Sequence, residues 1–345
     1  MTEGINKLVA GIRRFFLISL ILIASGGVVA GYWSYQLAQQ ELHLTGAPEL
    51  LEIKRGDHAK SILNDLAQRG WLTQAVTPSY FASRVWARPE GLQAGVYQVR
   101  DGQSLFELWQ QLRQGDQYQF SIALIEGQTL AQWLTAIGAH PYLAGTEELR
   151  SGGELVTKVT GSDQLNSLEG YLAPDTYHFY AGTAALKLLR TAYTAQQQRL
   201  LDAWQQRADD LPYATPYELL IMASIIEKET GLGSERDLVS SVFVNRLNTG
   251  MRLQSDPTTI YGIDNFDGNL TRAHLRETTA YNTYRIDGLP PTPIAMPSQA
   301  SLIAAAQPAT SPYFYFVADG SGGHVFSETL TEHNRAVNRY QRGKH

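Results

Sequence analysis

The sequence predicts an α+β protein with a single N-terminal transmembrane helix, an α/β module after it, and then an α+β domain with a buried helix at its centre. Three observations carry this prediction: an uncharged apolar span at residues 15–33, a repeated strand–turn–helix pattern between residues 51 and 137, and an apolar helix pattern at residues 216–226. A chain of 345 residues can hold two moderate domains, each with its own core.

The apolar span at residues 15–33 is long enough to cross a bilayer. Lys7, Arg13 and Arg14 precede it, and aromatic residues lie at its far end. Because cytoplasmic flanks carry the positive charges, we expect the N-terminus in the cytoplasm and the rest of the chain outside the inner membrane. A cleaved signal peptide is the alternative, but the apolar run exceeds a typical signal core and no convincing cleavage site follows it.

A strand–turn–helix pattern recurs after the anchor. The paired segments, strand first, are 51–54 with 58–70, 95–99 with 104–113, and 121–125 with 129–137. Units of this kind after a membrane anchor resemble the LysM-like modules that hold cell-wall glycan. Generic packing of strands against helices is the alternative.

Composition and charge narrow the class of function. The formal net charge of −5 argues against a nucleic-acid-binding protein, which would carry a basic stripe. The absence of cysteine excludes disulfides, thiolate metal sites and a cysteine nucleophile. His324 and His333 are too scattered to suggest a ligand cluster, so we expect no metal and no other cofactor.

The segment 215–231 predicts a buried helix that delivers a carboxylate, Glu227, at its end. Thr215 and Glu218 have the spacing of a capping box, and Gly231 offers a C-terminal cap. The residues between leave no polar face, so the helix should be buried. Burial and the helix dipole both disfavour an ionised carboxylate at this end, and a protonated carboxyl is what a general acid needs. The alternative is a helix end that simply enters solvent.

Loop-like segments around this helix combine amide, hydroxyl and carboxyl groups with aromatic rings. Such groups hydrogen-bond to a sugar polymer and stack on it, although each also has a structural interpretation as a cap, a turn or a connector. We assign substrate-side roles to Glu169, Asn245, Gln254, Asp256, Tyr261, Tyr281, Asn282 and Tyr284.

Taken together, these segments resemble the YceG-like family of endolytic murein (peptidoglycan) transglycosylases, also called MltG. The most specific pieces are LEGYLAPDTY (168–177), ASIIEKET (223–230), VFVNRL (242–247), GMRLQSDPTTIYG (250–262), AYNTY (280–284), GLPPTPI (288–294) and YFVADGSGGHVF (315–326). One departure is Thr292, where the family pattern has glycine. The resemblance implies that the catalytic residue is Glu227, the first glutamate of the Ser-Ile-x-Glu-Lys-Glu motif.

The resemblance also implies the reaction, which is cleavage of the β-1,4 bond between N-acetylmuramic acid and N-acetylglucosamine. Glu227 would protonate the leaving oxygen and then accept the proton of the muramic C6 hydroxyl, which closes onto C1 to give a 1,6-anhydro end. Glu229, two residues on, points away from Glu227 and receives no role. The implied partners are peptidoglycan glycan strands, the inner membrane and peptidoglycan synthases, and the implied task is termination of nascent strands.

Two alternative functions stay open. A lysozyme-like muramidase would hydrolyse the same bond, with Asp256 or Glu169 as its second carboxylate. A non-enzymatic cell-wall-binding or scaffold protein would cleave nothing. The predicted organisation is a cytoplasmic tail (1–14), a transmembrane helix (15–35), a tether (36–48), the LysM-like module (49–146) and the YceG-like catalytic domain (147–345).

Overall fold

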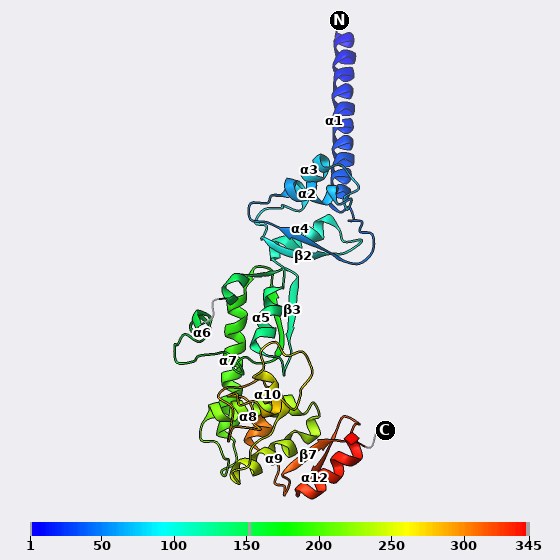
Figure 1. Cartoon of the computed structure of the whole chain (residues 1–345). Coiled ribbons are helices and arrows are strands. Elements are labelled where there is room, and N and C mark those ends of the chain that lie inside the picture. Colours follow the sequence, from blue (N-terminus) through cyan, green and yellow to red (C-terminus); the bar gives the residue numbers. More distant parts are fainter. Residues whose placement is uncertain (1, 151–152, 343–345) are drawn as a thin grey trace. The chain divides into compact units, whose positions relative to one another are not determined.

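A computed structural model describes residues 2–150 and 153–342, and the chain forms two compact units (Figure 1). The first unit comprises Met1–Phe120 with Tyr180–Gly182, and the second comprises Ser121–Phe179 with Thr183–His345. The limits given above for the LysM-like module and the catalytic domain stay predictions.

The first unit begins with a long helix and continues as a small α/β module. Its elements are α1 (Thr2–Ala38), β1 (Glu49–Ile53), α2 (Ala59–Gln68), α3 (Val76–Trp86), β2 (Gly95–Val99) and α4 (Leu105–Gln114). The first two predicted strand–helix pairs are therefore present, with α3 as an additional helix between them. Strands β1 and β2 pair antiparallel, with Leu51 opposite Tyr97. Both side chains are fully buried with Trp109 of α4, whose indole N–H donates to the Ser83 hydroxyl at 3.0 Å.

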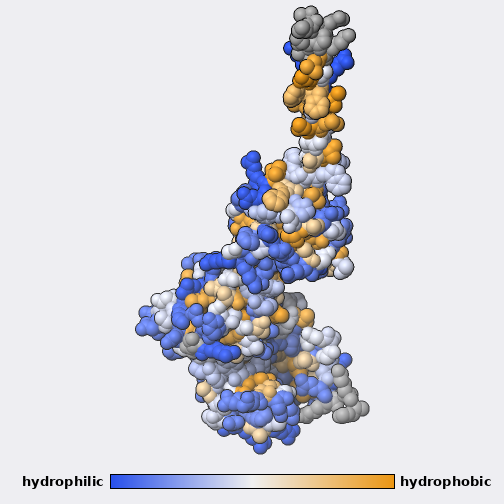
Figure 2. All heavy atoms as spheres, turned by 90° about the horizontal axis from the view of Figure 1, so that it is seen from above, coloured by the Kyte–Doolittle hydropathy of each residue, from blue (hydrophilic) through white to orange (hydrophobic). Residues whose placement is uncertain are grey.

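Within the described residues, α1 is the one helix that is long and apolar enough to cross a membrane, over Gly11–Ala38. Its apolar side chains are exposed over most of this length, and Figure 2 shows them as an apolar surface. The predicted apolar helix is therefore present.

The second unit is α+β and holds the third predicted strand–helix pair. Its strands are β3 (Gln119–Leu124), β4 (Leu143–Ala144), β5 (Asp175–Tyr180), β6 (Thr183–Ala184), β7 (Tyr315–Ala318) and β8 (His324–Ser327), although the first two residues of β3 and the last residue of β5 belong to the first unit. Its helices are α5 (Leu130–Gly138), η1 (Thr146–Arg150), α6 (Gly153–Thr160), α7 (Ala185–Gln205), α8 (Pro216–Glu229), η2 (Gly233–Glu235), α9 (Arg236–Asn248), α10 (Asp256–Tyr261), η3 (His274–Arg276), α11 (Gln299–Ala306), α12 (Leu330–Val337) and η4 (Asn338–Arg342). Strands β3 and β5 pair, β4 and β6 pair in parallel, and β7 and β8 form an antiparallel hairpin.

Helix α8 is the centre of the second unit and packs against α7, α9, α10 and α11 (Figure 1). The predicted capping box is present, because the Thr215 hydroxyl accepts from the Glu218 N–H while the Glu218 carboxylate accepts from the Thr215 N–H. All residues from Leu219 to Ile226 are buried, as the apolar pattern predicts. The predicted glycine cap is wrong, because the helix ends at Thr230 in an extended conformation.

Candidate active site in the second unit

The end of α8 carries Glu227 and Glu229, and the two carboxylates contact different residues. Positions two apart on an α-helix point about 200° from each other around its axis. Accordingly, Glu227 contacts the start of α11, whereas Glu229 contacts Ser255, which precedes α10. The environment of each side chain, rather than its place in the motif, therefore indicates what it can do.

Glu227 is enclosed by hydrogen-bond donors. Its Oε2 accepts from the Ser298 N–H at 2.8 Å, the Ser298 hydroxyl at 2.5 Å and the Ser301 hydroxyl at 2.7 Å. Its Oε1 lies 3.6 Å from the Arg236 guanidinium, and the side chain is only 4% exposed. Donors therefore engage one carboxylate oxygen and a guanidinium faces the other, so protein contacts hold the Glu227 carboxylate. The protonated carboxyl expected from the sequence stays a prediction. The contacts tie the end of α8 to the N-terminus of α11.

Glu229, in contrast, borders open space. Its carboxylate accepts one hydrogen bond of 2.5 Å, from the Ser255 hydroxyl, and it lines a pocket of about 440 Å³. Burial is the largest influence on the pKa of Glu229 and raises it to about 7. The hydrogen bond from Ser255 lowers this pKa, the charge of Asp256 raises it, and His324 and Arg246 have smaller lowering effects. A carboxyl that titrates near neutral pH can both donate and accept a proton, as a general acid–base group must.

Segments far apart in the sequence form the pocket around Glu229. They are the ends of α8 and α9, the residues before α10, the loop at Tyr284, the β7–β8 hairpin and the C-terminal helices. Its lining residues are Glu229, Arg246, Leu253, Gln254, Asp256, Tyr284, Tyr315, Phe316, Val317, Ala318, His324, Leu330, His333, Val337 and Gln341. Three residues with predicted substrate-side roles are among them, namely Gln254, Asp256 and Tyr284.

Hydrogen bonds join the loop of Tyr284 to the segment 254–256, which leads into α10 and ends at its first residue, Asp256. The Tyr284 hydroxyl donates to Asp256 Oδ1 at 2.7 Å. The Gln254 N–H donates to the Thr283 carbonyl at 3.2 Å, and the Ser255 N–H donates to the Thr283 hydroxyl at 2.9 Å. Asp256 and Tyr284 therefore reach the pocket as one hydrogen-bonded pair.

Gln254 has a strained backbone, with φ at +51°. For a residue other than glycine this conformation costs of the order of 1 kcal/mol or more, and it persists where the surroundings impose it. The side chain of Gln254 is exposed beside Glu229, where its amide can contact a ligand.

Arg246 and His324 also line the pocket, and the sequence analysis missed both. The Arg246 guanidinium donates to the carbonyls of Phe314 at 2.7 Å and Leu253 at 2.6 Å, and thereby joins the hairpin to the loop before α10. His324 Nδ1 lies 2.8 Å from a carboxylate oxygen of Glu235. The sequence contains a usable signal for Arg246, because an arginine at the end of an apolar helix pattern can be buried only for a specific purpose. In the structure Arg246 is 7% exposed. For His324 the sequence offers no comparable signal.

Glu169, Tyr261 and Tyr281 form a second cluster that does not belong to the Glu229 pocket as the structure describes it. Glu169 is 4% exposed and accepts from the Leu130 N–H and from the Tyr261 hydroxyl at 3.1 Å. Burial raises the pKa of Glu169 to about 7, against the lowering effect of these two bonds. The rings of Tyr261 and Tyr281 meet edge to face, and the Tyr281 hydroxyl pairs with that of Thr292, the residue that departs from the family pattern.

Asn245 and Asn282 use their amides inside the protein. The Asn245 amide donates to the carbonyls of Ser311 and Tyr313, both at 2.9 Å. Asn282 is fully buried, and its side chain donates to two backbone carbonyls while accepting from the Thr259 hydroxyl and the Tyr284 N–H. These contacts support roles in holding loops rather than substrate, and their predicted substrate contacts stay predictions.

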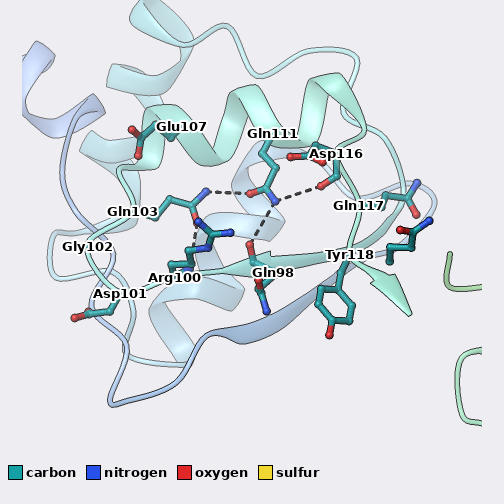
Figure 3. A pocket seen from close by; sticks show the side chains of 11 residues that line it. Gln98, Arg100, Asp101, Gly102, Gln103, Glu107, Gln111, Asp116, Gln117 and Tyr118 are labelled. Atoms are coloured by element: carbon teal, nitrogen blue, oxygen red, sulfur yellow. Dashed lines mark hydrogen bonds between the residues drawn. The ribbon is translucent and has the colours of Figure 1, made fainter. Parts of the chain in front are cut away.

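The first unit has a pocket of its own, of about 550 Å³, between β2 and α4 (Figure 3). Its lining is polar and consists of Gln98, Arg100, Asp101, Gly102, Gln103, Glu107, Gln111, Asp116, Gln117, Tyr118 and Gln119. Gln103 donates to Gln111, which donates in turn to the carbonyls of Gln98 and Asp116. This amide chain, together with Arg100 and Tyr118, suits a ligand that is rich in hydroxyl or amide groups.

No group of three His, Cys, Asp or Glu side chains suited to a metal ion occurs in the part of the chain that the structure describes. The expected absence of a metal and of other cofactors stays a prediction.

Comparison with known proteins identifies the relatives of this chain. The sequence profile of the YceG-like family matches residues 51–339. The endolytic murein transglycosylase of Bacillus subtilis is 32% identical over 272 residues, which cover 72% of this chain and 73% of that protein. The endolytic murein transglycosylase of Streptococcus pneumoniae (strain D39) is 27% identical, over 95% of this chain and 65% of its own length. A crystal structure of a putative yceG-like protein from Listeria monocytogenes superposes with a TM-score of 0.55 at 27% identity, and the match covers 84% of this chain and 99% of that one.

Proposed function

Because the chain belongs to the YceG-like family, we propose that it is an endolytic murein transglycosylase, a lyase that acts on the glycan strands of peptidoglycan. It cleaves the β-1,4 bond between N-acetylmuramic acid and N-acetylglucosamine and leaves a 1,6-anhydro end. The observation that carries this proposal is Glu229, a carboxyl that titrates near pH 7 in a polar pocket of about 440 Å³.

We assign the acid–base role to Glu229, with Glu227 as the competing prediction from the motif. Three features favour Glu229: it lines the pocket, burial raises its pKa to about 7, and a single serine hydroxyl occupies its carboxylate. Glu227 accepts three hydrogen bonds and faces Arg236, so a proton transfer there would disrupt contacts that hold α11.

The proposed reaction uses one carboxyl twice. Protonated Glu229 donates its proton to the glycosidic oxygen, and the bond from the muramic C1 to that oxygen breaks. The muramic C6 hydroxyl then attacks C1 and loses its proton to the Glu229 carboxylate, which restores the starting state. No water is consumed, and the ring closure is fast because both reacting atoms belong to one sugar.

The other pocket side chains have supporting roles in this scheme. Asp256 lies close enough to raise the pKa of Glu229, and the Tyr284 hydroxyl holds Asp256 in place. The Arg246 guanidinium and the exposed amide of Gln254 supply donors for the hydroxyl and acetamido groups of the sugar.

The apolar helix supports a location at the membrane. We propose that α1 spans the inner membrane with the N-terminus in the cytoplasm and the remainder of the chain in the periplasm. Anchoring confines cleavage to strands close to the membrane, where peptidoglycan synthases work, so the enzyme would terminate nascent strands. A reporter that is active only outside the inner membrane should work after His345 and fail before Met1. The reverse pattern would contradict this topology.

The polar pocket of the first unit supports a second contact with glycan, as expected of a LysM-like module. In a cleavage-deficient background, Arg100→Ala should reduce retention of the full chain on insoluble sacculi. Arg55→Ala, an exposed site outside this pocket, is the matched control. Equal retention of both variants would contradict the assignment.

Product chemistry tests the reaction itself. The full chain, incubated with purified sacculi in water labelled with oxygen-18, should release fragments with unlabelled 1,6-anhydro ends, identified by mass spectrometry. Labelled reducing ends would instead support a muramidase. One observation favours that second candidate: Asp256 lies in the same pocket as Glu229, and two carboxylates are what a hydrolase uses.

A further inference from the structure

Helix α3 presents three of its large apolar side chains to solvent, although two others, Val76 and Tyr80, pack partly against the core of the module. Phe81, Val85 and Trp86 are exposed to 63%, 64% and 43%, whereas the buried positions of the helix are Ser79, Ala82 and Ser83. An amphipathic helix in a soluble module normally keeps large apolar side chains on the face that meets the core. A contiguous exposed apolar face of this kind marks a surface that another apolar phase covers.

Direct contacts fix α3 to the last turns of α1. The Trp86 indole N–H donates to the Ser34 hydroxyl at 3.2 Å, and its ring meets that of Tyr35 edge to face at 5.4 Å. The Gln40 amide donates to the Ser79 hydroxyl at 2.8 Å. Both helices belong to the same compact unit, so the level of α3 along α1 is defined.

That level corresponds to the surface of a bilayer that α1 spans. The apolar hydrocarbon core is about 30 Å thick, which takes about 20 residues of a helix that rises 1.5 Å per residue. Counted from Phe15, the first residue after Arg14, the core ends near Ser34, the residue that contacts Trp86. Tryptophan and tyrosine favour this depth because their rings are apolar and their N–H or O–H groups are polar.

The charges near the exposed face of α3 also fit a lipid bilayer as its partner. Arg84 lies on the exposed side of α3, and Arg88 is exposed just after the helix. Basic residues beside an apolar helix face bind the phosphates of lipid headgroups. The one ion pair of this group that the structure describes joins Arg84 to Glu90 at 3.7 Å, on the surface, where such pairs are weak.

We infer that the outer face of α3, formed by Phe81, Val85 and Trp86, inserts into the headgroup region of the same bilayer that α1 crosses. The inference depends on the proposed membrane span of α1. The first unit is then attached to the bilayer by both α1 and α3, which restricts its rotation about α1. The module of residues 49–114 therefore stays at the membrane surface.

The chain has no cysteine, so single cysteines can carry a nitroxide label without background. We would label the full chain at Phe81→Cys or Val85→Cys, reconstitute it in vesicles of phosphatidylcholine and phosphatidylglycerol, and compare relaxation by oxygen with relaxation by a water-soluble nickel chelate. Ile23→Cys reports on the anchor, and Lys60→Cys, exposed on α2, reports on water. We expect labels at 81, 85 and 23 to respond mainly to oxygen and the label at 60 mainly to nickel.

The outcomes separate this inference from the proposed anchor. If the labels at 81 and 85 respond mainly to nickel while the label at 23 responds to oxygen, the anchor stands and the insertion of α3 is refuted. If the label at 23 also responds to nickel, α1 does not span the bilayer and both statements fail. Labels at 81 and 85 that are shielded from both reagents would indicate a protein partner, such as a second copy of this chain, and would overturn the inference.

Discussion

Glu227 and Glu229 leave the same helix end, yet one is enclosed by protein and the other borders a pocket. Both carboxylates are removed from water. In exchange, Glu227 accepts three hydrogen bonds and lies next to the Arg236 guanidinium, whereas Glu229 accepts one hydrogen bond, from the Ser255 hydroxyl. Burial alone therefore does not prepare a carboxyl for proton transfer. Shortage of donors, together with access to open space, is what makes Glu229 the better acid–base candidate.

The largest expected effect is the loss of cleavage in Glu229→Gln. Glutamine matches the shape of glutamate but cannot exchange the proton, so we expect a loss of about 10²–10⁴-fold, since one group serves both steps. The measurement is the rate of release of anhydro ends from sacculi. Glu227→Gln is the matched variant, two residues away, and should keep far more activity. The reverse ranking would restore Glu227 as the catalytic residue.

The second prediction concerns stability. Here the change at Glu227 should have a larger effect on the free energy of unfolding than the change at Glu229. Glu227→Ala leaves Arg236 and two serine hydroxyls without their acceptor, which should lower the free energy of unfolding by about 3 kcal/mol. Unfolding of the protein by a denaturant at pH 7 measures this change in free energy. Glu229→Ala is the control and should cost clearly less, because it removes only the bond from Ser255. Equal losses would mean that both glutamates are structural.

The third prediction uses the charge of Asp256 to move the pH profile. The acid must be protonated, so cleavage should fall as pH rises through about 7, the pKa of Glu229. Asp256 raises this pKa, and therefore Asp256→Asn should shift the falling limb to lower pH. A limb that stays in place would exclude Glu229 as the titrating group, and Asp237→Asn, on the exposed side of α9, controls for a general change of charge.

The same raised pKa has a consequence for folding. The folded state holds the Glu229 proton up to about pH 7, whereas the unfolded chain releases it near 4.5, so the folded state binds more protons between these values. The contribution of Glu229 to stability therefore decreases as pH rises through this window. Glu229→Gln should flatten that part of the stability profile, and an unchanged slope would contradict the raised pKa.

The smallest expected effect is that of Tyr284→Phe. The ring stays, and only the hydrogen bond to Asp256 is lost, which corresponds to about 1 kcal/mol or less than tenfold in rate.

Asn282→Ala should behave differently, with a lowered thermal midpoint, because the buried amide serves four partners within the protein. A normal midpoint with lost cleavage would instead support the predicted substrate contact of Asn282.

Local sequence determined the elements that carry the site. The apolar run, the capping box at Thr215 and Glu218, and the turn-rich hairpin segment each act over a few residues, so α1, α8 and the β7–β8 pair could be predicted. The motifs also selected Gln254, Asp256 and Tyr284, which the fold brings together beside α8.

Only the tertiary structure decided which glutamate meets the pocket. Helical spacing places Glu227 and Glu229 on different sides of α8, but nothing local says that α11 covers one side and that Arg246 and His324 border the other. Groups from distant segments set the surroundings of each carboxylate, because electrostatic and hydrogen-bond energies depend on distance in space. For the same reason the sequence alone grouped Glu169, Asn245 and Asn282 with the pocket residues, whereas the fold gives them partners elsewhere.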